Sequence, residues 1–296
     1  MSDHHHHHVS GKNLFITIIL NILITLAQIV GGILSGSLAL LSDAMHNFSD
    51  VLALVIAYVA NRLAAKPKSK EFTFGLKRAE ILAALLNALV LVGIGIFLIV
   101  EAVRKFIHPE PIDSTLVIWL GVLSIVLNSV SVLLIKEDAH ESMNVKAAYL
   151  HLLTDVMTSI AVVIGGVAMA LWHIYWIDAA ISILIALYLI KEAIALVTES
   201  AAILMQSAPK GIDIEEVAKV IESEPAIDNV HHIHLWQLDD KQIFLEAHID
   251  FKKDLRLSEC NEILEKIEKK LGTLHILHTT FQCEYARNHS KEKIPN

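Results

Sequence analysis

Long apolar stretches fill the first two thirds of this chain of 296 residues. Six of them come close to or exceed the roughly 20 residues with which an α-helix crosses the hydrocarbon core of a bilayer. The first is too long for a secretory signal and lacks its small-residue cleavage site, so we expect it to remain in the protein. The pattern predicts an α-helical membrane protein with a bundle of six transmembrane helices. We expect these spans at residues 14–34, 37–59, 80–100, 114–135, 147–171 and 176–197.

The pattern changes after about residue 207, where charged residues interrupt the apolar ones. Helical spacing and strand-like alternation then follow one another along the chain. The order helix, strand, strand, helix, strand predicts a small α+β domain (αββαβ), whose ~85 residues suffice for a core of its own. The expected segments are a helix at 212–223, strands at 230–238 and 242–251, a helix at 257–271 and a strand at 274–285.

Basic residues gather in one of the short loops. The loop between the third and fourth spans holds only Arg104 and Lys105. The positive-inside rule places the more basic loop, between the second and third spans, in the cytoplasm, and an even number of spans then places both termini there too. We therefore expect a multi-pass protein of the cell inner (plasma) membrane. The basic residues of the cytoplasmic loop are Arg62, Lys66, Lys68, Lys70, Lys77 and Arg78.

Composition agrees with a membrane protein, since 54% of residues are hydrophobic, 19% are charged and the mean hydropathy is +0.54. The formal net charge of −8 argues against nucleic acid as a partner, because nucleic acid requires a basic face. His4 to His8 are either a native metal-capturing segment or the remnant of a purification tag. The expected parts are a His-rich N-terminal tail (1–12), a transmembrane domain (13–205), a cytoplasmic α+β domain (206–290) and a short C-terminal tail (291–296).

Two of the apolar spans carry the same pair of ionisable residues at the same spacing. His46 precedes Asp50 by four residues in the second span, and His151 precedes Asp155 by four in the fifth. Residues four apart lie on one face of a helix. Ionisable groups at membrane depth are costly and persist with a partner, usually for function. Two imidazoles and two carboxylates amount to a tetrahedral site for a divalent metal such as Zn²⁺.

The alternative interpretation is that each His–Asp pair is only a buried hydrogen-bonded couple, which two matched pairs make less favourable than one. If the groups bind metal, two His and two Asp suit Zn²⁺ and admit Cd²⁺ or Co²⁺. An all-oxygen site would favour Mn²⁺ or Mg²⁺, and missing thiolates argue against Cu⁺. The affinity order of divalent metals also admits Ni²⁺ and Cu²⁺ at such a site. Metal and protons compete for the same atoms, and no P-loop pattern is present to bind ATP. A proton gradient is therefore the expected energy source.

The residues in these positions resemble the cation diffusion facilitator family, and most closely its bacterial cobalt-zinc-cadmium exporters. The resemblance covers residues 14 to 285 and rests on five stretches: Ser35–Leu40, Leu41–Asp50, Phe74–Glu80, Asn144–Asp155 and His231–Trp236. It implies a homodimer that exports cytoplasmic Zn²⁺ in exchange for protons by alternating access. It also implies that the cytoplasmic domain binds metal and stabilises the dimer or senses metal.

By the same resemblance, His231, His248 and Glu284 fall near positions that bind metal in the tail, with Cys260 as a possible fourth ligand. Strand alternation predicts His232 and His234 on one face of the first strand and His231 on the other. Scattered strand histidines are also often plain surface residues. Phe72 and Leu76 occupy a loop where some family members carry another metal site, so we expect none there.

Two carboxylates outside the motifs have open roles. Asp43 is either an orienting partner for an imidazole or a residue of the helix start or of the pore mouth, and Asp178 is expected to be a solvated carboxylate at the start of the sixth span. Two other functions fit the residues less well. An intramembrane metallohydrolase needs an open coordination position and a general base, and no His-Glu-x-x-His occurs. A passive channel or membrane metal sensor would show no dependence on a pH gradient.

Overall fold

A computed structural model of the chain describes residues 11–136, 143–239, 242–286 and 292–293. These residues fall into two compact units. The first comprises the chain up to residue 58 together with 86–196, and the second comprises 59–85 together with 197 onward. His4 to His8 lie outside the described residues.

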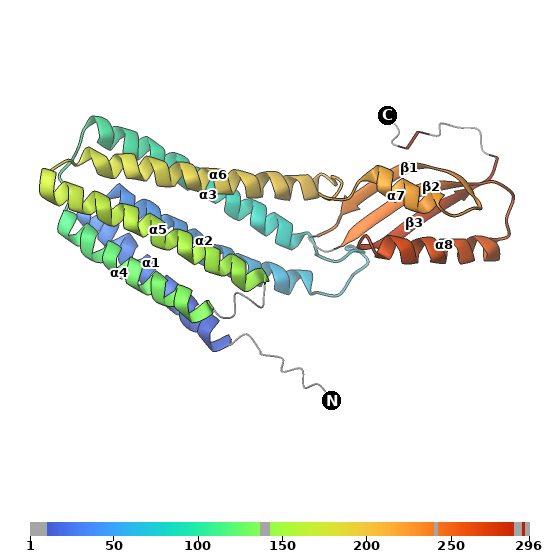
Figure 1. The fold of residues 1–296 in the computed structure, drawn as a ribbon, viewed down its shortest axis with the longest axis horizontal. Coiled ribbons are helices and arrows are strands. Elements are labelled where there is room, and N and C mark those ends of the chain that lie inside the picture. Colours follow the sequence, from blue (N-terminus) through green and yellow to red (C-terminus); the bar gives the residue numbers. More distant parts are fainter. Residues whose placement is uncertain (1–10, 137–142, 240–241, 287–291, 294–296) are drawn as a thin grey trace. The chain divides into compact units, whose positions relative to one another are not determined.

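Six long helices follow one another along the first part of the chain (Figure 1). Each is long and apolar enough to cross a membrane, which confirms the predicted number of spans. Two of them, with 29 residues each, extend well beyond the predicted limits, because polar residues at their ends continue the helix. The helices are α1 (Gly11–Ser35), α2 (Leu38–Ala64), α3 (Ala79–Ile107), α4 (Ser114–Ile135), α5 (Met143–Trp172) and α6 (Trp176–Leu204).

Within the first unit, α4 packs against both α1 and α5. Gly121 permits the close approach of α4 and α5, since a Cβ at this position would lie 2.5 Å from Cγ2 of Val163. Buried apolar residues from α2, α3, α5 and α6 form the core of the bundle. Large apolar side chains such as Ile33, Leu133 and Leu184 point outward, as expected for helices that face lipid.

Asp178, in the first turn of α6, is buried rather than solvated, so the expectation for this residue was wrong. Its carboxylate accepts hydrogen bonds from the backbone N–H of Leu38, at 2.7 Å, and from that of Ala39 and the Ser37 hydroxyl. These donors belong to the start of α2, where N–H groups have no partner within the helix. Asp178 therefore caps α2 from a distant part of the sequence.

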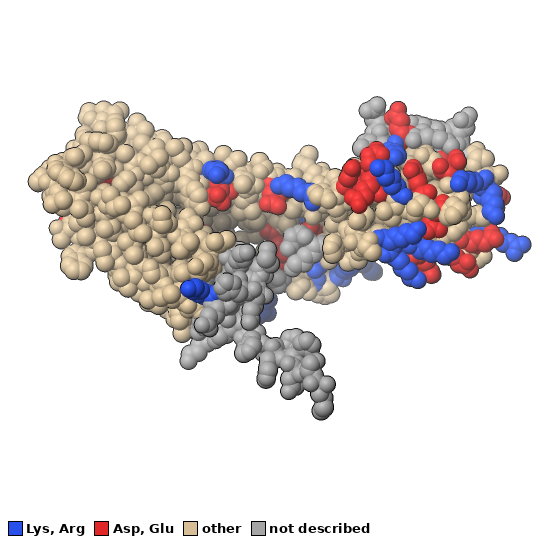
Figure 2. All heavy atoms as spheres, viewed as in Figure 1, with Lys and Arg blue, Asp and Glu red and all other residues tan. Residues whose placement is uncertain are grey.

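The second unit contains the α+β domain, with the predicted order αββαβ. β2 lies in the centre of the sheet, antiparallel to β1 and parallel to β3. α7 contacts β1, α8 contacts β3, and the two helices contact each other, so both cover one face of the sheet. Charged residues are dense on this domain and sparse over the transmembrane helices (Figure 2). The elements are α7 (Ile214–Glu222), β1 (Ile227–Gln237), β2 (Ile243–Phe251), α8 (Leu257–Gly272) and β3 (Ile276–Glu284).

A bulge interrupts β1 and changes which of its residues share a face. His231 pairs with His248 and His234 with Glu246, so β1 has one more residue than β2 between these pairs. His232 takes a positive φ of 50° at this point. Val230, Ile233 and Leu235 all belong to the core beneath the helices. The predicted strict alternation was therefore wrong, because the bulge places two successive residues on the same face of the strand.

Candidate metal centres

The four motif residues of the transmembrane helices come together between α2 and α5. Their contacts cross from one helix to the other. Nε2 of His151 lies 3.0 Å from Oδ2 of Asp50, and Nε2 of His46 lies 3.5 Å from Oδ1 of Asp155. Within α5, the His151 to Asp155 separation is 3.9 Å. Two ligands of one tetrahedral Zn²⁺ with bonds of about 2.1 Å are about 3.4 Å apart. The separations bracket this value.

Burial divides the four residues into an inner and an outer pair. His46 is 7% exposed and Asp155 is 1% exposed, whereas His151 and Asp50 are half-buried. Nε2 of His46 and both carboxylate oxygens of Asp155 have no hydrogen-bond partner among the residues that the structure describes. Buried polar atoms in native proteins normally have partners. Buried nitrogen and oxygen atoms that lie close together and lack hydrogen-bond partners are suited to bind a cation.

Three of the four residues form the tightest group. Ligand atoms of His46, His151 and Asp155 all lie within 4.8 Å of one another, and Asp50 adjoins the group through His151. The site thus offers nitrogen and oxygen ligands and no sulfur. This donor set fits Zn²⁺ and related borderline metals.

Asp43 does not orient an imidazole, so that interpretation was wrong. Its buried carboxylate accepts hydrogen bonds from Gln28 at 2.6 Å, Thr158 at 2.8 Å and Ser159 at 3.1 Å. These partners lie on α1 and α5, while Asp43 lies on α2. The side chain of Asn47 also donates to Gln28. Asp43 therefore connects three helices beside the candidate site and holds α2 against α5.

Tyr188 of α6 is a neighbour that the sequence motifs did not indicate. Its ring centroid lies 6.1 Å from that of His46, in an edge-to-face arrangement. The rings of His46 and His151 are 5.3 Å apart. A single tyrosine within an apolar span carries no spacing signal, so only the packing of α6 reveals it.

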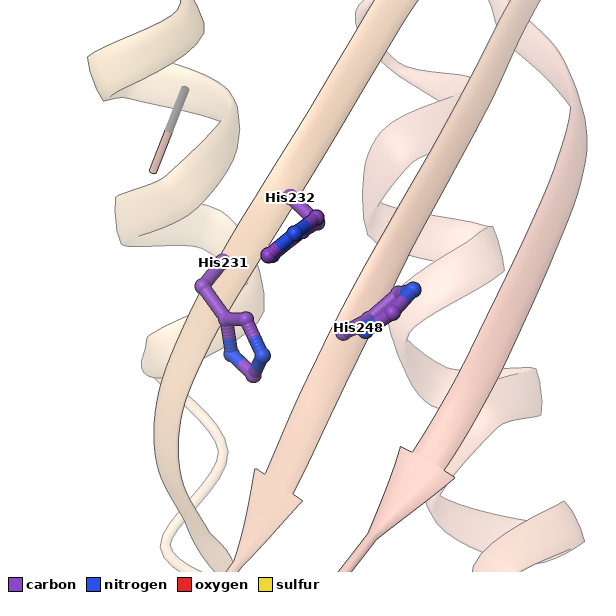
Figure 3. A group of neighbouring side chains, drawn as sticks. All are labelled: His231, His232 and His248. Atoms are coloured by element: carbon purple, nitrogen blue, oxygen red, sulfur yellow. The ribbon is translucent and has the colours of Figure 1, made fainter. Parts of the chain in front are cut away.

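A second cluster lies on the sheet of the tail domain (Figure 3). His231, His232 and His248 each offer a ring nitrogen, and these nitrogens lie within 4.8 Å of one another. The rings of His232 and His248 stack with centroids 4.8 Å apart, and the ring of His231 stands 5.3 Å from each. The bulge of β1 is what brings His232 to this group.

Carboxylates surround these histidines. Oε1 of Glu284 lies 3.1 Å from Nδ1 of His248, and its Oε2 lies 3.7 Å from Nε2 of His231. Oδ2 of Asp250 lies 3.6 Å from Nδ1 of His231. The structure thus brings together His231, His248 and Glu284, which the resemblance had singled out, and adds His232 and Asp250.

Cys260 is not a member of the group of three neighbouring histidines. It lies on α8, where it is buried in the core of the domain, and its nearest reactive neighbour is Cys283 of β3. Cys283 is exposed, and its partial burial together with the contact to Cys260 raises the pKa of its thiol. Cys260 therefore behaves as a packed thiol, which is the commoner role of free cysteine.

Six membrane-spanning helices with a buried His–Asp constellation define a multi-pass membrane protein of the kind that handles metal cations. Comparison with known protein families agrees with this class. Residues 14–205 match the family described as the cation efflux transmembrane domain, and residues 209–285 match the cytoplasmic domain of cation efflux proteins. The chain belongs to the cation efflux family, the cation diffusion facilitators, and is a transporter rather than an enzyme.

Curated relatives match over nearly the whole chain. The cadmium, cobalt and zinc/H(+)-K(+) antiporter of Bacillus velezensis is 34% identical over 98% of this chain and 95% of its own length. The metal cation efflux system protein CzcD of Cupriavidus metallidurans is 34% identical over 96% of this chain and 90% of its own length. The zinc transporter ZitB of Pectobacterium atrosepticum is 35% identical, with 97% and 90% covered.

Proposed function

We propose that the chain exports Zn²⁺, and also Cd²⁺ and Co²⁺, from the cytoplasm in exchange for protons. His46, Asp50, His151 and Asp155 bind the cation at membrane depth, in a homodimer of the inner membrane with both termini in the cytoplasm. The observation that carries the proposal is the convergence of these side chains from α2 and α5, with buried ligand atoms that lack hydrogen-bond partners among the described residues. The names of the relatives from Bacillus, Cupriavidus and Pectobacterium support the choice of metals.

Proton coupling follows from the chemistry of the ligands. Imidazole binds a metal ion only in its neutral form and a carboxylate only in its ionised form, so protons and metal exclude each other. The contacts of His151 with Asp50 and of His46 with Asp155 give the metal-free site two His–Asp pairs that can hold protons. A conformation open to the outside releases metal as these pairs take up protons, and alternating access returns the site to the cytoplasm.

The histidine cluster of the tail is proposed as a second, non-transporting metal site. His231, His232 and His248 supply nitrogen ligands, and Glu284 supplies a carboxylate beside two of them. Metal bound there links β1, β2 and β3, which stabilises the domain. In a dimer, such a site would make the stability of the cytoplasmic domain depend on the cytoplasmic metal concentration.

The experiment uses the full-length protein in liposomes that contain a fluorescent Zn²⁺ indicator. An imposed pH gradient should drive Zn²⁺ against its own gradient, and the flux should stop when a protonophore removes the pH gradient. The name of the Bacillus relative includes potassium, so a parallel arm imposes a K⁺ gradient at equal pH on both sides. Zn²⁺ flux that ignores the pH gradient would overturn proton exchange and favour a passive channel.

A metallohydrolase is not favoured by the site. Four protein ligands around one ion would leave no position for a catalytic water.

A further inference from the structure

The second unit contains a pocket of about 500 Å³ that the transport chemistry does not use. It lies between the segment before α3, the first turn of that helix and the end of β1. Its wall is mainly apolar, with Phe72, Phe74, Leu82 and Trp236 among the lining residues, and its charged lining residues are Arg78 and Glu71. Phe72 and Leu82 are each about half exposed.

Aromatic contacts give this pocket a fixed wall. The ring of Trp236 stacks on that of Phe244 with centroids 4.5 Å apart. Phe74 stands edge-on to both rings, 6.2 Å from Trp236 and 5.5 Å from Phe244. The loop before α3 and the helix-free face of the sheet are thereby joined within this unit. These stacked and edge-to-face contacts connect the three rings into one wall of the pocket.

Arg78 gives the pocket its binding chemistry. The guanidinium carbon lies 5.7 Å from the centroid of the Trp236 ring, which orients the side chain against the aromatic wall. Its Nε is buried and has no hydrogen-bond acceptor among the described residues. A buried donor without an acceptor is costly, and the planar guanidinium is suited to a phosphate oxygen. Although Glu71 also lines the pocket, Nε of Arg78 has no acceptor among the described residues and can still donate to an anionic ligand.

The pocket lies at the depth of lipid headgroups. α3 begins at Ala79 and its 29 residues span about 43 Å at 1.5 Å per residue. A bilayer is about 30 Å thick in its hydrocarbon core and about 40–45 Å with headgroups included. The first turn of α3, which contains Leu82, therefore reaches the headgroup layer.

The charge of the adjoining segment favours an acidic occupant. Between residues 62 and 78 the only acidic residue is Glu71, whereas the basic residues are Arg62, Lys66, Lys68, Lys70, Lys77 and Arg78. Clusters of this size beside a membrane helix attract acidic lipids. The excess of positive charge and the apolar wall together match a molecule with an anionic head and a hydrocarbon tail.

We propose that this pocket binds the headgroup of an anionic phospholipid. The phosphate accepts hydrogen bonds from Arg78, and the glycerol and upper acyl chain lie against Phe72, Leu82 and Trp236. Bound lipid then acts as a further contact between the loop before α3 and the sheet. The proposal does not depend on the transport cycle.

Native mass spectrometry of the full-length protein in detergent tests this binding. The protein is titrated with phosphatidylglycerol and, separately, with phosphatidylcholine of the same chains. We expect phosphatidylglycerol to bind with the higher affinity. Arg78→Gln should weaken its binding about tenfold, the loss expected for a hydrogen bond to a charged group. Lys253→Gln, which makes the same charge change at an exposed residue outside both the pocket lining and the basic cluster, should leave the affinity within twofold.

Three results would overturn the proposal. These are equal binding of the two lipids, equal loss in the Arg78 and Lys253 variants, and competition by millimolar inorganic phosphate that displaces the lipid completely. The last would show a free phosphate site. Leu82→Glu provides a second variant at an exposed helix position, where the new carboxylate repels the phosphate. Retained binding of phosphatidylglycerol by this variant would also count against the pocket.

Discussion

Nε2 of His151 lies 3.0 Å from Oδ2 of Asp50, a residue of the facing helix, and farther from Asp155 of its own helix. The two motifs therefore do not act as two separate pairs. Each helix supplies one imidazole and one carboxylate, and each imidazole meets the carboxylate of the other helix. Separation of α2 from α5 breaks both contacts at once, so the state of the site is tied to the distance between these helices.

Replacement of Asp155 by Asn should abolish transport while the protein still folds. The carboxylate of Asp155 is 1% exposed and faces both histidines. Replacement by an amide keeps the size of the side chain but removes its negative charge. Zn²⁺ uptake in liposomes should fall to the level of empty vesicles, with an unchanged elution volume in size-exclusion chromatography. Glu101→Gln makes the same chemical change at the end of α3 and should retain uptake. Retained uptake by the Asp155 variant would exclude this residue as a ligand.

His46→Asp should broaden the metal preference toward Cd²⁺ and Mn²⁺. The change replaces a buried imidazole by a smaller carboxylate, whose oxygen suits the harder Mn²⁺ and whose size leaves more room for the larger Cd²⁺. Competition of each metal against Zn²⁺ uptake measures the preference. His173→Asp, at the exposed end of α5, serves as the matched control. An unchanged order of metals in the His46 variant would place selectivity elsewhere in the protein.

Asp178→Ala should lower stability more than Asp113→Ala. Asp178 accepts hydrogen bonds from two backbone N–H groups and a hydroxyl in a buried place, whereas Asp113 caps α4 through one bond at the surface. Loss of an exposed cap costs about 1 kcal/mol. Loss of the buried acceptor leaves several donors unsatisfied and should cost roughly 2–3 kcal/mol or more. Thermal unfolding in detergent compares the two variants, and equal shifts of Tm would contradict the assignment.

His248→Ala should remove the stabilisation of the tail domain by Zn²⁺. His248 contacts His231, His232 and Glu284, so its loss opens the centre of the cluster. The test uses Asp155→Asn protein, in which the transport site is impaired, and follows Tm as Zn²⁺ is added.

His234→Ala is the control for the tail cluster. His234 lies on the same strand but outside the group of three neighbouring histidines. We expect Zn²⁺ to raise the Tm of this control and to leave that of the His248 variant unchanged. The same rise in both proteins would show that the histidine cluster does not hold the ion.

Much of the fold, and the helix faces of the candidate site, follow from residues that are close along the chain and can be predicted from the sequence. Six apolar stretches give six helices, and the spacing of four residues places His46 with Asp50 and His151 with Asp155 on single helix faces. These patterns depend only on residues that are close along the chain. The αββαβ order of the tail was predictable for the same reason.

The errors concern contacts between distant segments. The burial of Asp178 depends on the start of α2, 140 residues away, and that of Asp43 on donors from α1 and α5. No local pattern reports such partners. The position of His232 in the cluster depends on the bulge in β1. A bulge adds one residue to a strand, and the residue types of the strand do not reveal it.

The bulge also bears on how this tail can change over time. Apolar residues lie in the core on both sides of the bulge, Val230 before it and Ile233 after it. Deletion of the single codon for His232 therefore removes one imidazole and leaves both flanks of the strand in register. A change in length alone can thus remove one ligand of the proposed tail site, while the hydrophobic interior of the domain stays as it was.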